Sequence, residues 1–174
     1  LGTGHAVSLV LPELEGYEGD ILILYGDTPL FRPASIRGLI NRHIQKDAQL
    51  TLFTIETDQS LPYGRIIRDN EGRILDIIEQ ADASEDVRRI RELNLGAYVF
   101  DAQALASSLE PELEARKKRL LLTDSVHRLI RSGGRVESYR SLDQDEILGI
   151  NTPDDLAQAE LILQKRLLRP RRAE

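Results

Sequence analysis

The chain has 174 residues, of which 41% are hydrophobic and 30% charged, values that are typical of one globular domain with a real core. Its formal net charge of −6 gives no reason to expect a nucleic acid or a membrane surface as a partner. The absence of cysteine excludes disulfides, a thiol nucleophile and cysteine-bound zinc. No apolar run approaches the length of a membrane span and no signal peptide is evident, so we expect a cytoplasmic protein.

The first half of the chain alternates between helix and strand patterns. Gly2-Thr3-Gly4 predicts a turn into a short helix over 6–11, with Thr3 as candidate N-cap. The unbroken apolar run Ile21–Leu24 predicts a strand over 20–25 that is buried on both faces, as in a parallel sheet under helices. The elements that follow are a helix from Pro33, a strand over 50–57, a hairpin of 65–68 and 73–79, and a short helix after Ser84.

The second half continues the alternation. The predicted elements are a strand over 95–100, a helix capped by Asp101, a charged loop or frayed helix over 112–119, a helix from Thr123-Asp124 and a strand over 135–142. A last helix begins at Thr152-Pro153, and its apolar stripe consists of Leu156, Ala159, Leu163 and Leu167. This order predicts the α/β class, with a Rossmann-like, mostly parallel sheet, helices on both faces and one inserted hairpin.

One turn in this pattern points to a ligand site. Tyr25-Gly26-Asp27 ends the first strand, and ligands of open α/β sheets bind outside the carboxyl ends of the strands. Asp27 is therefore a carboxylate at a ligand-binding position, beside a glycine that allows close approach to the backbone. From this motif alone, the alternative that Asp27 only caps its turn is equally open.

Seven motifs resemble, in order, those of the sugar-nucleotide nucleotidyltransferases. They are Leu1-Gly2-Thr3-Gly4-His5-Ala6, Leu24-Tyr25-Gly26-Asp27-Thr28-Pro29-Leu30, Tyr63-Gly64-Arg65-Ile66, Ile78-Glu79-Gln80-Ala81-Asp82-Ala83, Leu93-Asn94-Leu95-Gly96, Leu122-Thr123-Asp124 and Gly149-Ile150-Asn151. Within the family the chain most resembles the uridylyltransferase domain of the bifunctional UDP-N-acetylglucosamine pyrophosphorylases. The resemblance implies a partial nucleotidyltransferase domain over 1–169, followed by a basic tail or the start of a linker over 170–174.

The resemblance also implies a reaction and a set of site residues. The reaction is transfer of a nucleotidyl group from UTP to N-acetylglucosamine 1-phosphate with release of pyrophosphate, a step that supplies cell-envelope precursors. Mg²⁺ is the implied cofactor, with Asp27 and Asn151 as its catalytic ligands, a minimal oxygen set of the kind that Mg²⁺ accepts. The implied substrate contacts fall into four groups: Gly2 and Thr3 to the uracil, Tyr25 and Gly26 to sugar and nucleotide, Gly64, Glu79 and Asn94 to the amino sugar and ribose, and Thr123 near the sugar phosphate.

Each of these residues also has a purely structural interpretation. The glycines serve backbone geometry, Glu79 is a solvated carboxylate, Asn94 and Asn151 close turns, and Thr123 is an N-cap. Two departures from the family pattern stand out. Leu120-Leu121-Leu122 replaces the aromatic residues expected before the Thr-Asp pair, and the glycine-rich phosphate-binding loop that opens the family's domain has no counterpart.

The beginning of the chain suggests how it relates to the whole enzyme. Because the sequence contains no methionine and opens inside a family motif, we interpret it as an internal piece of a longer protein and expect the isolated piece to be inactive. Two other functions stay open: a nucleotidyltransferase for another UDP- or dTDP-sugar, and a non-catalytic regulatory or binding member of the fold. A homo-oligomer of the parent protein also stays open.

Overall fold

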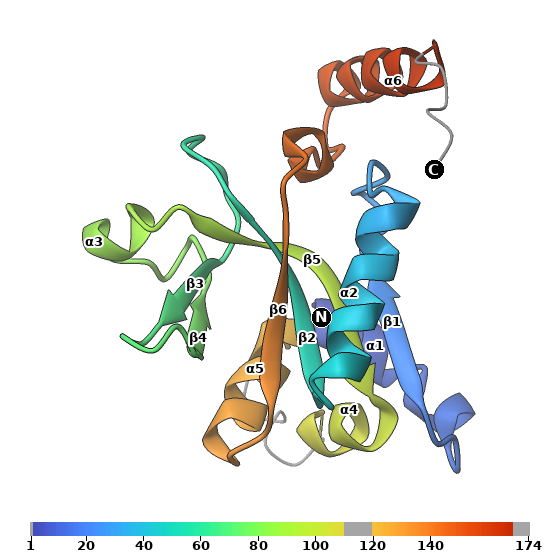
Figure 1. Ribbon diagram of the computed structural model, residues 1–174, viewed down its shortest axis with the longest axis vertical. Helices are drawn as coiled ribbons and strands as arrows, with labels where there is room; N and C mark the ends of the chain where they lie inside the picture. Colours follow the sequence, from blue (N-terminus) through green and yellow to red (C-terminus); the bar gives the residue numbers. More distant parts are fainter. Residues whose placement is uncertain (1, 110–119, 169–174) are drawn as a thin grey trace.

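The computed structural model describes residues 2–109 and 120–168 (Figure 1). Its helices are α1 (Thr3–Ser8), η1 (Leu11–Leu14), α2 (Pro33–Gln45), α3 (Glu85–Arg88), α4 (Ala102–Ser108), α5 (Leu122–Arg131), η3 (Gln144–Ile147) and α6 (Pro153–Leu168). Its strands are β1 (Asp20–Leu24), β2 (Leu50–Glu56), β3 (Arg65–Arg68), β4 (Ile74–Ile78), β5 (Glu92–Asp101) and β6 (Val136–Ser141). Within the described ranges, no helix is both long and apolar enough to cross a membrane. The predicted charged segment 112–119 and the tail 170–174 lie outside the described residues.

The six strands form one sheet with β5 at its centre. β5 pairs antiparallel with β2 along one edge and with β1 and β3 along the other. β4 extends the sheet beyond β3 as the predicted hairpin, and β6 extends it beyond β2 in parallel. β1, β2 and β6 therefore run in one direction, so their carboxyl ends lie at the same end of the sheet as the amino end of β5.

The expected α/β class, with helices on both faces and an inserted hairpin, is confirmed, but the expectation of mostly parallel pairing is wrong for the described strands. Only β2 and β6 pair in parallel among them; every other pairing is antiparallel. The reason is that an unbroken apolar run reports burial on two faces and carries no information about strand direction. The reversed β5 between β1 and β2 looks the same in sequence as a parallel strand.

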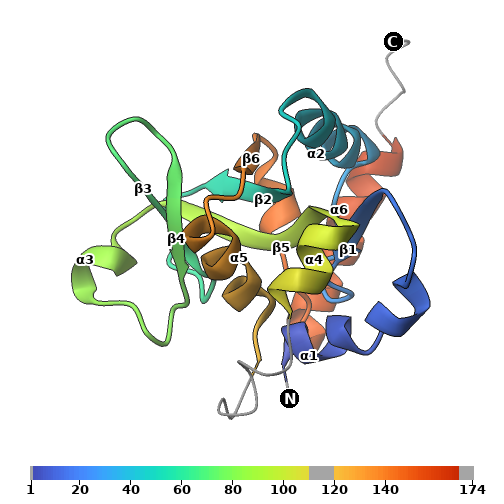
Figure 2. The same ribbon diagram turned by 90° about the horizontal axis from the view of Figure 1, so that it is seen from below.

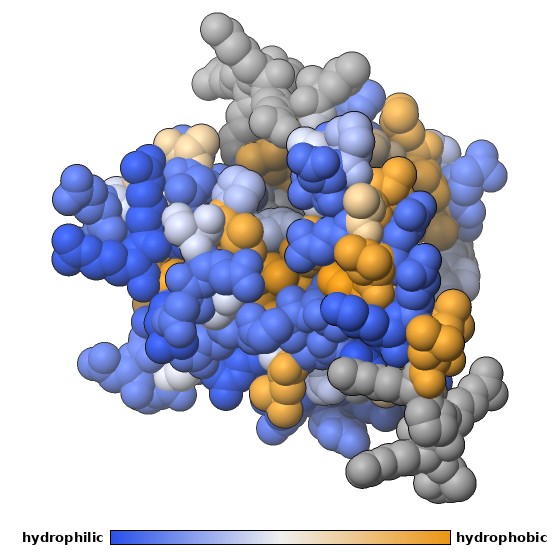
Figure 3. All heavy atoms as spheres, turned by 90° about the horizontal axis from the view of Figure 1, so that it is seen from above, coloured by the Kyte–Doolittle hydropathy of each residue, from blue (hydrophilic) through white to orange (hydrophobic). Residues whose placement is uncertain are grey.

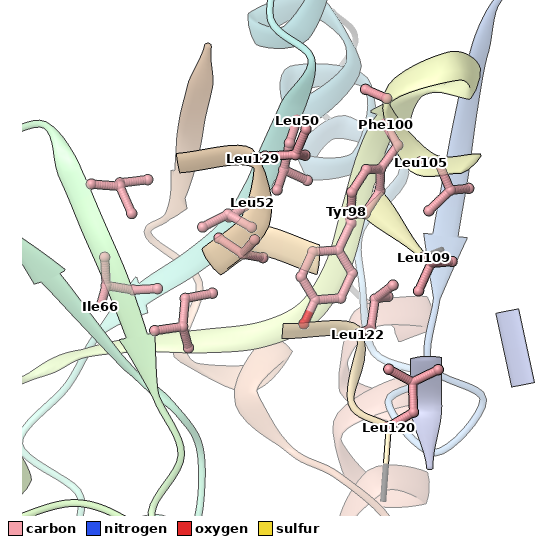
Figure 4. Close-up of a cluster of buried hydrophobic side chains, with 14 residues drawn as sticks. Leu50, Leu52, Ile66, Tyr98, Phe100, Leu105, Leu109, Leu120, Leu122 and Leu129 are labelled. Atoms are coloured by element: carbon pink, nitrogen blue, oxygen red, sulfur yellow. The ribbon is translucent and has the colours of Figure 1, made fainter. Parts of the chain in front are cut away.

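Two buried clusters cover the two faces of the sheet, and in Figure 2 helix α2 lies on one side of the central strands while α4 and α5 lie on the other. Successive side chains of a strand point to opposite faces, so Leu52 and Phe53 of β2 belong to different clusters. Helices α4 and α5 pack over the face that contains Leu52 and Tyr98, shown in Figure 4. Helix α2 contributes Leu39 to the other face. Both sides of the central strands are thereby shielded from water.

The first strand differs from its prediction. β1 pairs with β5 alone among the described strands and alternates in exposure, with Leu22 39% and Leu24 45% exposed. The expectation that it is buried on both faces is therefore wrong in this structure. Ile21 and Ile23 do pack against the core cluster that contains Tyr98. The apolar run of β1 thus covers one face of the sheet and leaves leucines at an open edge.

Local sequence signals predicted most of the helix starts correctly. The side chains of Ser84 and Asp101 accept the capping hydrogen bonds of α3 and α4, and Pro33 opens α2 as predicted. Thr3 is not an N-cap, because α1 begins at Thr3 itself and Gly2 precedes it. The Thr3 hydroxyl instead accepts a hydrogen bond from the backbone N–H of Leu122 at 3.0 Å. This contact joins the start of α1 to the start of α5.

Helix α6 lies at one end of the molecule, and its predicted apolar stripe is mostly exposed (Figure 1). Ala159 is its one buried residue in the described chain, while Leu156 and Leu163 are 49% and 42% exposed. Viewed from this end, the surface shows hydrophobic side chains among a largely hydrophilic face (Figure 3). Arg166 anchors the helix by donating to the carbonyl oxygen of Leu30 at 2.6 Å.

Candidate functional site

Polar residues from six separate parts of the chain line one cleft of about 850 Å³, a size that suits a small-molecule ligand. They come from the start of α1, the loop after β1, the segments on either side of the hairpin β3–β4, the beginning of β5, the start of α5 and the loop before α6. Of the ten predicted site residues, seven line this cleft: Thr3, Tyr25, Asp27, Gly64, Glu79, Asn94 and Asn151. Their placement agrees with the expectation that ligands bind at the end of the sheet where β1 ends.

A second hollow of about 670 Å³ lies between the α1–η1 segment and α4. Its lining contains apolar residues such as Leu11 and Leu109 and none of the predicted site residues. We therefore assign the candidate site to the polar cleft.

Asp27 and Asn151 are held near one another although 124 positions separate them in sequence. The backbone N–H of Ile150 donates to the carbonyl oxygen of Asp27 at 2.7 Å, which joins the loop after β1 to the loop before α6. Beside this contact, the Tyr63 hydroxyl donates to the carbonyl oxygen of Ile147 at 2.9 Å. Both metal-ligand candidates are exposed at the cleft, so their side-chain oxygens are accessible to a hydrated ion.

The start of α6 holds the backbone of Asn151 in place. The Asp155 carboxylate accepts hydrogen bonds from the backbone N–H groups of Asn151 at 3.0 Å and Thr152 at 2.8 Å. Hydrogen bonds from the Asn151 backbone, and from the Thr152 side chain and backbone, lower the pKa of Asp155 below its usual value. Because the N-terminus of a helix favours negative charge, this carboxylate also suits its place in the first turn.

The oxygen donors at the cleft have the chemistry that suits Mg²⁺, an ion that takes only one or two ligands from the protein. Asp27 offers a carboxylate oxygen and Asn151 an amide oxygen, which are hard ligands of the type that Mg²⁺ prefers. Among the described residues, no group of three His, Cys, Asp or Glu side chains could hold a metal ion. Two protein oxygens leave room for the waters and phosphate oxygens that normally complete the shell of Mg²⁺.

Thr123 does not line the cleft; it supports a residue that does, and it does not cap its helix. Its hydroxyl donates to Glu79 Oε1 at 2.8 Å, and the side chain is buried, with 4% exposed. The N-cap position of α5 belongs to Leu121, so the interpretation of Thr123 as an N-cap is wrong. Thr123 lies behind Glu79, which itself lines the cleft. The hydrogen bond limits the freedom of the Glu79 carboxylate.

Two predicted glycines do not line the cleft. Gly2 precedes α1 in an extended conformation, and its carbonyl oxygen accepts the N–H of Ala6 at 3.0 Å. At Gly26 an added Cβ would meet no atom within 4 Å, so packing does not require a glycine there. The structure thus gives Gly2 a helix-start role, and it places Gly26 in the turn just ahead of Asp27.

The structure also contains site residues that the sequence did not single out. Gln80 lines the cleft, and its buried Oε1 has no hydrogen-bond partner among the described residues. Tyr63 lines it as well, and burial together with the nearby Asp27 charge raises the pKa of its hydroxyl. Both residues lie inside motifs that carried the family resemblance. Their position in those motifs was the only available signal, because the side chains have no distinctive spacing.

Comparison with known proteins defines the class of this chain. A family model for nucleotidyl transferases matches residues 1–162, and the chain therefore belongs to the nucleotidyl transferase family. The chain is 38% identical over 168 residues to the bifunctional protein GlmU of Streptococcus suis and 39% identical over 168 residues to that of Corynebacterium diphtheriae. These alignments cover 96% of the chain but only 36% and 35% of the two relatives.

Solved structures support the same fold. The chain resembles a nucleoside-diphosphate-sugar pyrophosphorylase from Vibrio cholerae with a TM-score of 0.62 and 17% identity, covering 90% of this chain and 64% of the other. It resembles a Bacillus anthracis protein described as a glucose-1-phosphate thymidylyltransferase with a TM-score of 0.69 and 17% identity, covering 92% and 60%. The fold of a nucleotidyltransferase domain, which the motifs implied, is thus confirmed, as is the resemblance to the family.

Proposed function

We propose that this cleft binds a nucleoside triphosphate and a sugar 1-phosphate and transfers the nucleotidyl group to the sugar phosphate, with UTP and N-acetylglucosamine 1-phosphate as the substrates. The observation that carries the proposal is that Asp27, Asn151, Glu79 and Asn94 line one cleft. The first pair has the chemistry to bind a metal ion, and the second pair has the chemistry to grip sugar hydroxyl and acetamido groups. The family membership and the similarity to GlmU proteins support the choice of reaction.

The proposed chemistry needs no protein base. A phosphate monoester has a second pKa of about 6, so the attacking phosphate of the sugar is already ionised near neutral pH. One of its oxygens forms a bond to the α-phosphorus of UTP, while the bond from that phosphorus to the oxygen bridging the β-phosphorus breaks. Pyrophosphate leaves with the electron pair. Such a transfer depends mainly on positioning and on neutralisation of charge.

Different residues of the cleft are assigned to charge neutralisation and to substrate positioning. Asp27 and Asn151 would hold Mg²⁺, which supplies charge neutralisation to the phosphate oxygens when bound. Glu79, held by Thr123, accepts hydrogen bonds from sugar hydroxyls. Thr3 and Tyr25 lie at the α1 and β1 side of the cleft and are assigned to the nucleotide.

The test is a substrate panel with the intact gene product. Pyrophosphate release is measured with UTP or dTTP against N-acetylglucosamine 1-phosphate or glucose 1-phosphate, in the presence of Mg²⁺. We expect the highest kcat/KM with UTP and N-acetylglucosamine 1-phosphate. A preference for dTTP or for glucose 1-phosphate would establish the alternative sugar nucleotide. Binding of UTP by calorimetry without release of pyrophosphate from any pair would support the non-catalytic alternative.

A further inference from the structure

Tyr98 is a buried polar residue that the proposed chemistry does not use. It is 0% exposed, lies in the middle of β5, and is absent from the lining of the cleft. Its ring packs among the leucines of the core (Figure 4). A core position of this kind is normally occupied by an apolar residue, because a buried hydroxyl needs a hydrogen-bond partner. The two residues that contact the Tyr98 hydroxyl, Asn94 and Tyr25, both line the cleft.

The first partner is Asn94. Its Nδ2 donates to the Tyr98 hydroxyl at 2.7 Å, although the two residues are four positions apart on the same strand. On a straight strand such residues lie about 13 Å apart. The pairing of β5 with β2 shifts here: Tyr98 is opposite Leu52 and Asn94 is opposite Thr54, so β5 accommodates two more residues than β2. This bulge brings the Asn94 amide within reach of the Tyr98 hydroxyl.

The orientation of the Asn94 amide follows from a second contact. The backbone N–H of Gly96 donates to Asn94 Oδ1 at 3.5 Å. A backbone N–H only donates, so the amide oxygen faces Gly96 and the amide nitrogen faces Tyr98. One hydrogen of Nδ2 and one lone pair of Oδ1 then remain for a ligand, because Asn94 lines the cleft.

The other partner is Tyr25. The two phenol oxygens lie 3.5 Å apart, and the ring centroids are 6.0 Å apart with a tilt of 55°. The Tyr98 oxygen accepts from Asn94, and in its contact with the Tyr25 oxygen either hydroxyl can be the donor. Burial raises the pKa of the Tyr98 hydroxyl well above its usual value, so the hydroxyl keeps its hydrogen at ordinary pH.

We propose that Tyr98 is a positioning residue, which orients the carboxamide of Asn94 and the ring of Tyr25 at the back of the cleft without touching the substrate. The inference rests on the proposed function for its kinetic consequence, since Asn94 is assigned to the sugar and Tyr25 to the nucleotide. Through these two residues, one buried hydroxyl sets the geometry on both sides of the cleft.

The kinetic test uses Tyr98→Phe in the intact gene product, with Tyr139→Phe as the matched control. Tyr139 stacks on Phe53, with ring centroids 5.8 Å apart, and does not line the cleft. The loss of one net hydrogen bond is expected to raise the KM for the sugar 1-phosphate about fivefold to tenfold in Tyr98→Phe, with a smaller change in the KM for UTP. The control should leave both constants unchanged. Unchanged constants in an active Tyr98→Phe variant would overturn the inference.

A double-mutant cycle separates positioning from an independent effect. If Tyr98 acts through Asn94, Tyr98→Phe should add little to the sugar 1-phosphate KM of Asn94→Ala. Additive increases in KM would overturn the assigned route. A purely structural role predicts a lower thermal midpoint in Tyr98→Phe without any selective change in one KM.

A spectroscopic measurement tests the geometry without activity. In ¹⁵N-labelled wild-type protein, the side-chain amide protons of Asn94 should show nuclear Overhauser contacts to the Tyr98 ring, and their resonances should move in Tyr98→Phe but not in Tyr139→Phe. Absence of the wild-type contact would overturn the inference even if Tyr98→Phe does not fold. A wild-type protein that shows the contact and releases no pyrophosphate would refute the proposed function alone.

Discussion

Gly96 and the ring of Tyr25 are in such close contact that a Cβ at Gly96 would lie 2.4 Å from Tyr25 Cδ2. Gly96 also has a φ of +72°, and its carbonyl oxygen accepts the backbone N–H of Tyr25 at 3.3 Å. A left-handed backbone and a close neighbour therefore both require glycine at this position. The contact places the Tyr25 ring at the cleft, since both residues line it.

Replacement of Gly96 by alanine should cost more than the backbone conformation explains. The left-handed conformation of a non-glycine residue costs roughly 1–2 kcal/mol, and we expect Gly96→Ala to exceed this because Tyr25 must move. Gly72→Ala is the matched control, because Gly72 has a φ of +80° and an added Cβ would meet nothing within 4 Å. Urea unfolding of both variants measures the difference. Equal losses of unfolding free energy would show that Tyr25 yields without cost.

Removal of the carboxylate of Asp27 should raise the magnesium requirement of the intact enzyme. Loss of a group that merely supports a metal ligand typically costs 10–100-fold in affinity, so we expect Asp27→Ala to raise the Mg²⁺ concentration for half-maximal activity by about 100-fold. Asn151→Ala should act in the same direction. Asp86→Ala is the control, since the Asp86 side chain is 92% exposed on α3, outside the cleft. A Mg²⁺ titration that is identical for Asp27→Ala and the wild type would contradict the assignment.

Glu79 and Thr123 should affect the same substrate to different degrees. Because a hydrogen bond to a charged group is worth roughly 1.5–3 kcal/mol, Glu79→Ala should raise the KM for the sugar 1-phosphate at least about tenfold and the KM for UTP by less. Thr123→Val removes the hydroxyl that donates to Glu79 and should produce a smaller rise in the same constant.

Steady-state kinetics with each substrate varied in turn measure both effects. Thr51→Val is the control for Thr123→Val, because Thr51 is also buried and its hydroxyl also contacts a side chain. That contact is with His43 Nδ1 at a distance of 2.9 Å, and neither residue lines the cleft. That variant should lower stability and leave the two KM values alone. Equal changes of both KM values in Glu79→Ala would argue against a sugar contact.

Glu92 should make folding stability depend on pH below neutrality. Burial opposes ionisation of this carboxyl, but hydrogen bonds from Arg68 at 2.6 and 2.7 Å and from Thr54 at 2.8 Å outweigh it and lower its pKa below 4.5. A lowered pKa in the folded state means that the stabilisation is present above about pH 4.5 and is lost as the pH falls through the folded-state pKa.

Glu92→Gln should therefore reduce the free energy of unfolding at pH 7 by about 1.5–3 kcal/mol, and the difference from the wild type should become smaller as the pH is lowered from 7 to about 3. Urea unfolding across this pH range measures it. Glu71→Gln is the control, because the Glu71 side chain is 71% exposed and should show no such dependence. A deficit that persists unchanged at pH 3 would mean that Glu92 stabilises the fold through packing and not through its charge.

Sequence alone determined the features of this protein that depend on residues close together in the chain. The caps formed by Ser84 and Asp101, and the hairpin turn before Arg73, were predictable because their hydrogen bonds join residues at most four positions apart. The family motifs likewise identified Asp27 and Asn151 as members of one set before their proximity was known. Short-range signals of this kind survive in any tertiary context.

Only the tertiary structure decided which distant residues share a site and how each is supported. Thr123 finds Glu79 44 positions away, and Tyr98 reaches Asn94 only because β5 bulges against β2. The direction of β5 was likewise invisible, because an apolar strand buried on two faces has the same composition whichever way it runs. Periodicity reports how much of a residue is buried, whereas the identity of its partner depends on how the whole chain is brought together.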